Sequence, residues 1–178
     1  MSASETTAAT TDIMKVFTHA LIDQLAAQAT ASPRKRAHQN VHAGSEDRVQ
    51  RFFVCADRGT YFRPHRHLTK FELAVVLRGR FDVVAFDDSG RIVDRWAVGE
   101  GTPGFAYETP SATWHTLIAQ TDGATFLEIK EGPYEPQSAV EFAAWAPPEG
   151  DAQVAAYLEW LRTAQPGSLS TTRPATIA

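Results

Sequence analysis

Short runs rich in β-branched and aromatic residues alternate with Gly, Pro and Asp through the middle of the chain, from position 49 to 130. Runs of this kind predict short strands joined by turns. The predicted strands are Gln50 to Ala56, Leu73 to Leu77, Arg80 to Phe86, Ile92 to Val98, Phe105 to Glu108, His115 to Ala119 and Ala124 to Ile129. Between two of them, Asp87-Asp88-Ser89-Gly90 predicts a hairpin loop in which Gly90 takes a positive φ. Many short strands without intervening helices predict a sandwich or barrel rather than a parallel sheet.

Helical spacing of apolar residues occurs only near the two ends of the chain. The first predicted helix is capped by Thr11 or Asp12 and ends at Ser32-Pro33. Its apolar residues, at spacings of three and four, are Ile13, Met14, Phe17, Leu21 and Leu25. We expect this helix to pack one stripe of its surface against the strands. A second helix is predicted from Asp151 to Ala164, with Val154, Tyr157, Leu158 and Leu161 on its buried side.

The length of 178 residues suits one domain, and composition divides it into four segments. Residues 1–10 are small and polar, which predicts a disordered tail. Residues 11–48 hold the first helix and an irregular arm that has no hydrophobic period. Residues 49–164 are expected to form the barrel with its C-terminal helix, and residues 165–178 a second disordered tail.

Charge and cysteine content exclude several classes of protein. A formal net charge of −4 gives no general attraction to a phosphate backbone, so nucleic acid is not an expected partner. No apolar run approaches the roughly 18 residues that a membrane span needs. Cys55 is the only cysteine, which excludes an intrachain disulfide and a multi-cysteine zinc site. Polar residues interrupt the apolar stretch from Ile13 to Ala27, unlike in a secretory signal, so a cytoplasmic location is the simplest expectation.

Three histidines and one glutamate have the spacing of metal ligands. Alternate side chains of an extended segment share a face, so His65 and His67 can point to one place. Glu72 follows a turn and can return on the adjacent strand, and His115 can add a third imidazole. This donor set suits one divalent transition metal ion such as Zn, Fe, Ni or Mn. A six-coordinate ion would keep two positions for water or substrate, whereas a tetrahedral ion would form a closed, structural site.

The segment that carries these residues resembles the cupin superfamily. The first cupin motif is Gly, five residues, His-x-His, three or four residues, Glu, six residues and Gly. The chain matches its positions with Gly59, His65, His67, Glu72 and Gly79, and matches the second motif with Gly104, Pro110 and His115. Ala112 and Ala119 stand where the second motif usually has Gly and Asn, and neither departure removes a ligand. The resemblance implies a mainly β cupin fold, a double-stranded β-helix or jelly-roll barrel, here with flanking N- and C-terminal helices. It also implies a homodimer.

Over roughly residues 30 to 160 the chain is similar to the WbuC-type cupin metalloproteins, which occur among bacterial O-antigen and surface polysaccharide genes. The segments that carry the likeness are Ser32 to Arg36 with Asn40 and His42, Val49 to Arg51, Thr60 to His67, Phe86 to Gly90, Thr113 to His115, and Lys130 to Tyr134. This resemblance implies a fold and a metal site, and no secure reaction.

Further polar residues are candidates for binding a ligand or transferring protons. The basic arm, with Asn40 and His42, can bind a phosphate or carboxylate group. The complete set of ligand-binding candidates is Arg34, Arg36, Asn40, His42, Arg63, Lys130 and Tyr134. Tyr61 shares strand parity with the two histidines, and Tyr61 and Glu108 are the candidate catalytic residues.

Three classes of function fit this pattern. The first is a metalloenzyme that acts on a small oxygen-rich molecule, such as a sugar or sugar nucleotide of surface polysaccharide metabolism. Its reaction would be isomerisation, epimerisation or oxygenation. The second is a non-catalytic binding or regulatory cupin, whose metal fixes a small ligand. The third is an interaction protein with a purely structural metal.

Overall fold

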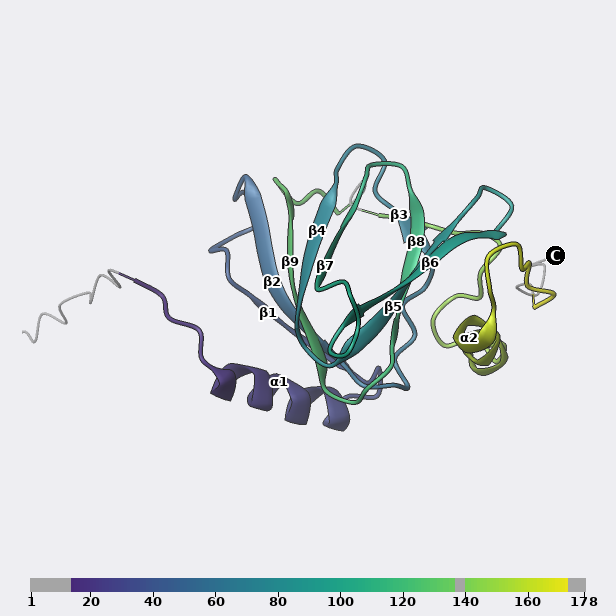
Figure 1. Ribbon diagram of the computed structural model, residues 1–178. Helices are drawn as coiled ribbons and strands as arrows, with labels where there is room; N and C mark the ends of the chain where they lie inside the picture. Colours follow the sequence, from purple (N-terminus) through teal and green to yellow (C-terminus); the bar gives the residue numbers. More distant parts are fainter. Residues whose placement is uncertain (1–13, 137–139, 173–178) are drawn as a thin grey trace, which may run out of the picture.

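Two five-stranded antiparallel sheets form the body of the protein, which a computed structural model describes over residues 14–136 and 140–172. The first sheet has the order β1 (Arg36–Asn40), β2 (Val49–Ala56), β9 (Ala124–Glu131), β4 (Glu72–Arg78) and β7 (Ala106–Thr109). The second has the order β10 (Glu141–Phe142), β3 (His65–Arg66), β8 (Trp114–Ala119), β5 (Arg80–Phe86) and β6 (Ile92–Gly99). The chain passes repeatedly from one sheet to the other, and the two sheets face each other as a jelly-roll barrel (Figure 1).

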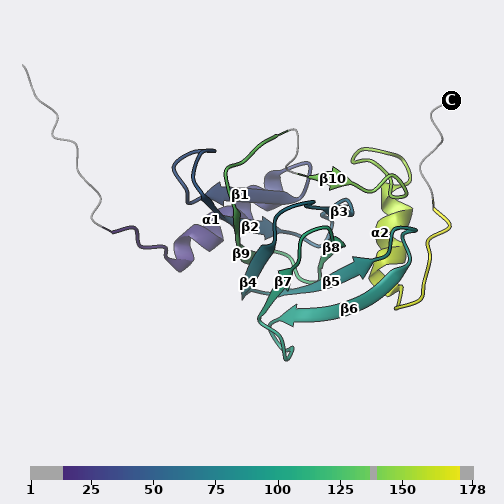
Figure 2. The ribbon, with the colours of Figure 1, turned by 90° about the horizontal axis from the view of Figure 1, so that it is seen from above.

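Three apolar clusters give the molecule its layers. Between the sheets lies the barrel core, built from residues such as Phe81, Leu117 and Phe126. Helix α1 (His19–Ala31) packs Leu25 and Ala29 on the outer face of the first sheet. Helix α2 (Val154–Thr163) packs on the outer face of the second sheet through residues that include Tyr157 and Leu161. The helices therefore lie on opposite sides of the barrel, as the view from above shows (Figure 2).

The regions with a clear hydrophobic pattern agree with the sequence prediction. All seven predicted strands occur, as β2 and β4 to β9, with ends that differ by at most two residues. The predicted hairpin loop occurs as well: the Asp87 carboxylate accepts hydrogen bonds from the Ser89 and Arg91 amides, and Gly90 has φ +85°. The predicted jelly-roll barrel with a helix on each side is thus confirmed.

The arm after α1 is a strand, and the prediction of irregular structure there was wrong for Arg36–Asn40. This segment, β1, pairs antiparallel with β2, from Arg36 opposite Ala56 to Asn40 opposite Phe52. As an edge strand it buries little, and its order comes from backbone hydrogen bonds to β2. Backbone pairing of this kind leaves no hydrophobic period in the sequence. The short strands β3 and β10 were missed for the same reason.

Helix α1 begins later than predicted. Its N-cap is Thr18, which is extended, whereas the expected caps Thr11 and Asp12 and the apolar Ile13 lie outside the described residues. Met14 is 77% exposed and precedes the helix, while Ile22, Leu25 and Ala29 form the buried stripe. Phe17 precedes the helix and still contacts the first sheet, with its ring 5.0 Å from that of Phe53 on β2.

The end of the chain is also more ordered than predicted. Ile92 donates its amide to the Ser168 carbonyl, and its own carbonyl accepts from Gly167. Residues 165–172 therefore belong to the fold, while the remaining parts of the two expected tails, residues 1–10 and 173–178, lie outside the described residues. Within the described part of the chain, neither helix has the length and apolar character needed to cross a membrane.

Candidate metal centre

The inner face of the first sheet changes from apolar to polar along its strands. At one end, Val54 of β2 lies opposite Phe126 of β9, which lies opposite Val76 of β4. Two rows further along the same strands, Gln50 lies opposite Lys130, which lies opposite Glu72. Because side chains alternate across a strand, all of these residues share the inner face. The polar row is buried, since Gln50 is 3% and Glu72 6% exposed.

The three histidines come from the second sheet and face this polar row. His65 on β3 pairs with His115 on β8, and His67 follows β3 directly. A tight turn after β7 ties the two segments together, because Ala112 donates its amide to the His67 carbonyl at 2.6 Å. Ala112 has φ +61°, so the turn keeps the conformation that favours Gly although Gly is absent. The departure from the usual motif at this position therefore leaves the turn intact.

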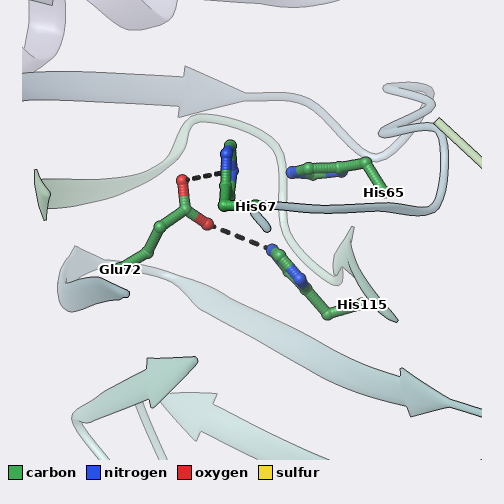
Figure 3. Close-up of side chains that lie close together, drawn as sticks. All are labelled: His65, His67, Glu72 and His115. Carbon is green, nitrogen blue, oxygen red and sulfur yellow. Dashed lines mark hydrogen bonds and ion pairs between the residues drawn. The ribbon is translucent and has the colours of Figure 1, made fainter. Parts of the chain in front are cut away.

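The four side chains place one ligand atom each within 4.8 Å of all the others (Figure 3). Glu72 Oε1 lies 2.8 Å from His67 Nε2, and Glu72 Oε2 lies 3.1 Å from His115 Nε2. The ring of His65 points toward the same space (Figure 3). Donors bound to one ion at about 2.0–2.2 Å lie within about 4.4 Å of each other, close to the observed spread.

Hydrogen bonds on the far side of two rings suit a metal. His65 Nδ1 lies 2.9 Å from the Arg63 carbonyl, and His115 Nδ1 lies 2.9 Å from the Thr113 carbonyl. A carbonyl can only accept, so each Nδ1 carries the proton and each Nε2 keeps its lone pair for a ligand bond. A buried group of three histidines and one glutamate with this polarity fits a divalent transition metal ion, whose identity the geometry does not determine.

Burial and neighbouring charges set the ionisation of the centre. Burial, reinforced by His115, lowers the pKa of His65 to about 3, so this ring stays neutral and able to bind metal. Burial alone would raise the pKa of Glu72. The contacts of its oxygens with His115 and His67, together with the Lys130 charge, instead hold the pKa of Glu72 well below its usual range. The carboxylate is therefore ionised.

A cavity of about 570 Å³ extends from the four ligands toward the surface. All seven residues that the sequence offered as ligand-binding candidates line it: Arg34, Arg36, Asn40, His42, Arg63, Lys130 and Tyr134. Lys130 reaches furthest toward the centre, with Nζ 3.1 Å from Glu72 Oε1. The rest of the wall includes apolar side chains such as Phe52, Phe62 and Leu117. A space of this size, lined by apolar side chains and by convergent polar groups, has the character of a small-molecule site.

The two candidate catalytic residues do not face this cavity. Tyr61 is buried against Tyr157 beneath α2, and its hydroxyl donates to the Pro147 carbonyl at 2.9 Å. The alternation of side chains that placed Tyr61 on the same face as His65 does not apply, because the strand begins only at His65. Glu108 is exposed on β7 and points away from the barrel interior, into which its neighbour Tyr107 points. Neither residue lines this cavity, although Glu108 lines a second pocket that also includes His115, so a catalytic role for the two residues stays a prediction.

Glu128 and Tyr107 are two of the polar residues of the cavity that sequence reasoning missed. Glu128 Oε1 lies 3.0 Å from Lys130 Nζ. Burial, and next the charge of Glu72, raise the pKa of Glu128 to about 8. Burial also raises the pKa of Tyr107 well above its usual value, with the charges of Glu128 and Glu72 adding to this effect. A signal for Glu128 was present, because it lies two residues before Lys130 in a strand and so shares its face.

Comparisons with known proteins support the fold and leave the activity open. A family model described as a domain of unknown function (DUF6016) matches residues 17–98. No curated protein gives a significant match. Among solved structures, the chain is similar to CapF in complex with 3-isopropenyl-tropolone, with a TM-score of 0.52 and 17% identity over 62% of this chain and 32% of CapF. The chain thus spans about a third of CapF.

Two further cupin structures are similar over comparable lengths. KdgF from Halomonas sp. is 22% identical with a TM-score of 0.44, over 60% of this chain and 84% of KdgF. An oxalate oxidase in complex with the substrate analogue glycolate is 17% identical with a TM-score of 0.47, over 65% of this chain and 58% of the oxidase. At these identities the likeness concerns the fold alone. The WbuC type stays a prediction.

Proposed function

We propose that the protein is a metal-dependent cupin that acts on a small, oxygen-rich molecule, such as a sugar or sugar nucleotide. The observation that carries this proposal is the position of His65, His67, Glu72 and His115 at the inner end of the 570 Å³ cavity. A structural metal needs no such space beside it, whereas a metal that binds substrate does. The cavity thus favours an ion with coordination positions left for a ligand.

The protein's own residues have distinct roles in this proposal. His65, His67, Glu72 and His115 would hold the ion, which supplies Lewis acidity to ligand oxygens when bound. Lys130 keeps a positive charge between Glu72 and Glu128, and the apolar wall at Phe52 limits the access of water. Isomerisation, epimerisation and oxygenation all begin with a ligand held in this way. A cupin that only binds the ligand would use the same residues.

The proposal includes the WbuC type and a connection to surface polysaccharide metabolism. Its support is that the residues of that resemblance, from the basic arm to Lys130 and Tyr134, converge on one cavity. It also includes a homodimer in the cytoplasm. Cys55, which is free and buried, is compatible with a reducing compartment.

The decisive experiment is elemental analysis of the full chain purified without metal-affinity resin, combined with the coordination number from X-ray absorption spectroscopy. We expect one equivalent of a transition metal with five or six ligands. His67→Ala should lose the ion, while His38→Ala, which changes another histidine of the cavity wall, should retain it. Full metal content in His67→Ala, or a four-coordinate ion bound only by protein, would overturn the proposal.

A further inference from the structure

Among the charged side chains that line the cavity, cations outnumber carboxyl groups. Four are cations, namely Arg34, Arg36, Arg63 and Lys130, and two are the carboxylates Glu72 and Glu128. The carboxyl groups of Glu72 and Glu128 lie 3.1 and 3.0 Å from Lys130, so they interact with that cation rather than with the arginines. A divalent ion at the four metal ligands would add to the positive excess. The cavity is therefore electrostatically suited to a ligand that carries negative charge.

Arg63 is the cavity arginine with the least compensation. One of its amino groups donates to the Ala143 carbonyl at 2.8 Å, and its guanidinium lies 5.2 Å from the centroid of the Phe142 ring. Its Nε is buried and has no hydrogen-bond partner within the described part of the chain. No carboxylate among the described residues comes within 4.0 Å of it, whereas both other arginines have one. A buried donor without a partner costs free energy that a ligand oxygen would recover.

Arg63 is also close to the metal centre. Its backbone carbonyl holds Nδ1 of His65, and the Phe142 ring that its guanidinium covers lies 6.1 Å from the His65 ring. One aromatic ring thus separates the guanidinium from a proposed metal ligand. A ligand of sugar size can reach both.

Arg34 and Arg36 already converge on a carboxylate, that of Glu149. Arg34 donates to both of its oxygens, at 3.1 and 2.6 Å, and Arg36 lies 2.8 Å from one of them. Arg36 is additionally fixed by donating to the Tyr61 carbonyl and by lying over the Phe62 ring. The Glu149 side chain is 41% exposed and does not line the cavity. Glu149 therefore binds, from outside the cavity, the guanidinium groups of two arginines that also line the cavity.

We propose that the ligand carries a carboxylate or phosphate group that Arg63 and Arg36 bind, and that Glu149 competes with this group for Arg36. This inference rests on the proposed function and narrows its substrate class to anions, such as sugar acids or sugar phosphates. Guanidinium groups recognise both kinds of anion through paired hydrogen bonds. Neutral sugars would leave Arg63 uncompensated.

The test is a titration of the full-length, ¹⁵N-labelled protein with inorganic phosphate and, separately, with acetate, each compared with chloride at equal ionic strength. We expect the Nε–H resonances of Arg63 and Arg36 to shift and saturate with at least one of the two probes and not with chloride. The probe that binds more tightly identifies the anion as phosphate or carboxylate. Arg63 resonances that stay unchanged with both probes, or that shift equally with chloride, would overturn the proposal.

Substitutions separate the anion site from general charge effects. Arg63→Met should weaken binding of the preferred probe by about tenfold or more. Arg91→Met is the matched control, because Arg91 also donates to one backbone carbonyl, that of Gly167, but lies outside the cavity. Equal losses in the two variants would contradict a specific site. Since Arg63→Met removes a contact to the β10 segment, the wild-type titration stands as the test if that variant does not fold.

Glu149→Gln tests the competition directly. Removing this carboxylate charge frees Arg36, so the preferred probe should bind at least about threefold more tightly. Unchanged or weaker binding would show that Glu149 is not a competitor.

The titrations are repeated after chelation of the metal: anion binding that persists in a protein that never takes up metal would leave this inference standing while the proposed function fails. Metal uptake without anion binding would give the reverse result.

Discussion

The two ends of the barrel interior are built on the same strands and differ in almost every physical property. At the closed end, Phe81, Ala119 and Ala124 pack between the sheets and are fully buried. At the open end, the same strands turn Glu72, Lys130 and His115 inward. Burying apolar groups is favourable, whereas burying charged groups is costly unless they are paired. The closed end therefore stabilises the fold, whereas the buried charged groups of the open end indicate a binding site.

This difference predicts how each end responds to change. Loss of volume at the closed end should lower stability and leave the donor set of the centre in place. Loss of a charge or of the ion at the open end should change binding first and stability less. Four experiments compare these two responses.

The largest effect is expected from Phe81→Ala at the closed end. Phe81 is fully buried, with its ring 5.3 Å from that of Phe126, and truncation would leave a cavity. We expect the free energy of unfolding to fall by about 3–5 kcal/mol, measured by denaturant titration. The metal content of the folded fraction should stay at the wild-type value. Loss of metal from folded protein would show that the two ends are not independent.

Removal of the metal should have the next largest effect. An ion that binds only the folded state stabilises it by about 2.7 kcal/mol when its free concentration is a hundred times its Kd. Chelation should therefore lower the thermal midpoint of the wild type and leave that of His67→Ala unchanged. A loss greater than that caused by Phe81→Ala would reverse the comparison, because the open end would then be the main source of stability.

Lys130→Met should have a smaller effect, which depends on the metal. Without Lys130, Glu72 and Glu128 face each other without a cation, at a position where Lys130 is only 18% exposed. Breaking a buried ion pair costs several kcal/mol at most, and partial exposure reduces this to about 2 kcal/mol in metal-free protein. Added metal should recover much of the loss. Lys70→Met, which removes a lysine that donates to the Pro133 carbonyl, should show no such dependence on metal.

The sequence predicted the fold best where burial imposes a pattern. The strands β2 and β4 to β9 alternate or run apolar because they line the core, and their ends were close to correct. Strand β1 and residues 165–172 were missed because backbone hydrogen bonds at sheet edges need no particular side chain.

The metal donor set was predictable for a different reason. Its spacing follows from strand geometry and from a motif, so His65, His67, Glu72 and His115 could be named together. Tyr61 shows the limit of such reasoning, because parity was applied to residues that precede the strand. Glu149 could not have been found from sequence at all, since it lies 115 residues after the arginine that it binds.

The smallest effect is expected from Ala112→Gly in the turn that joins the histidine segments. Ala112 has φ +61°, a conformation that costs residues other than Gly about 1–2 kcal/mol. Part of this gain is offset by the greater backbone entropy of unfolded Gly, so the free energy of unfolding should rise by about 1 kcal/mol. Ala97→Gly, in the ordinary backbone of β6, should instead lose about 0.5–1 kcal/mol. Equal signs for the two variants would show that the turn is not strained, and that Ala112 holds His67 near His115 at no cost.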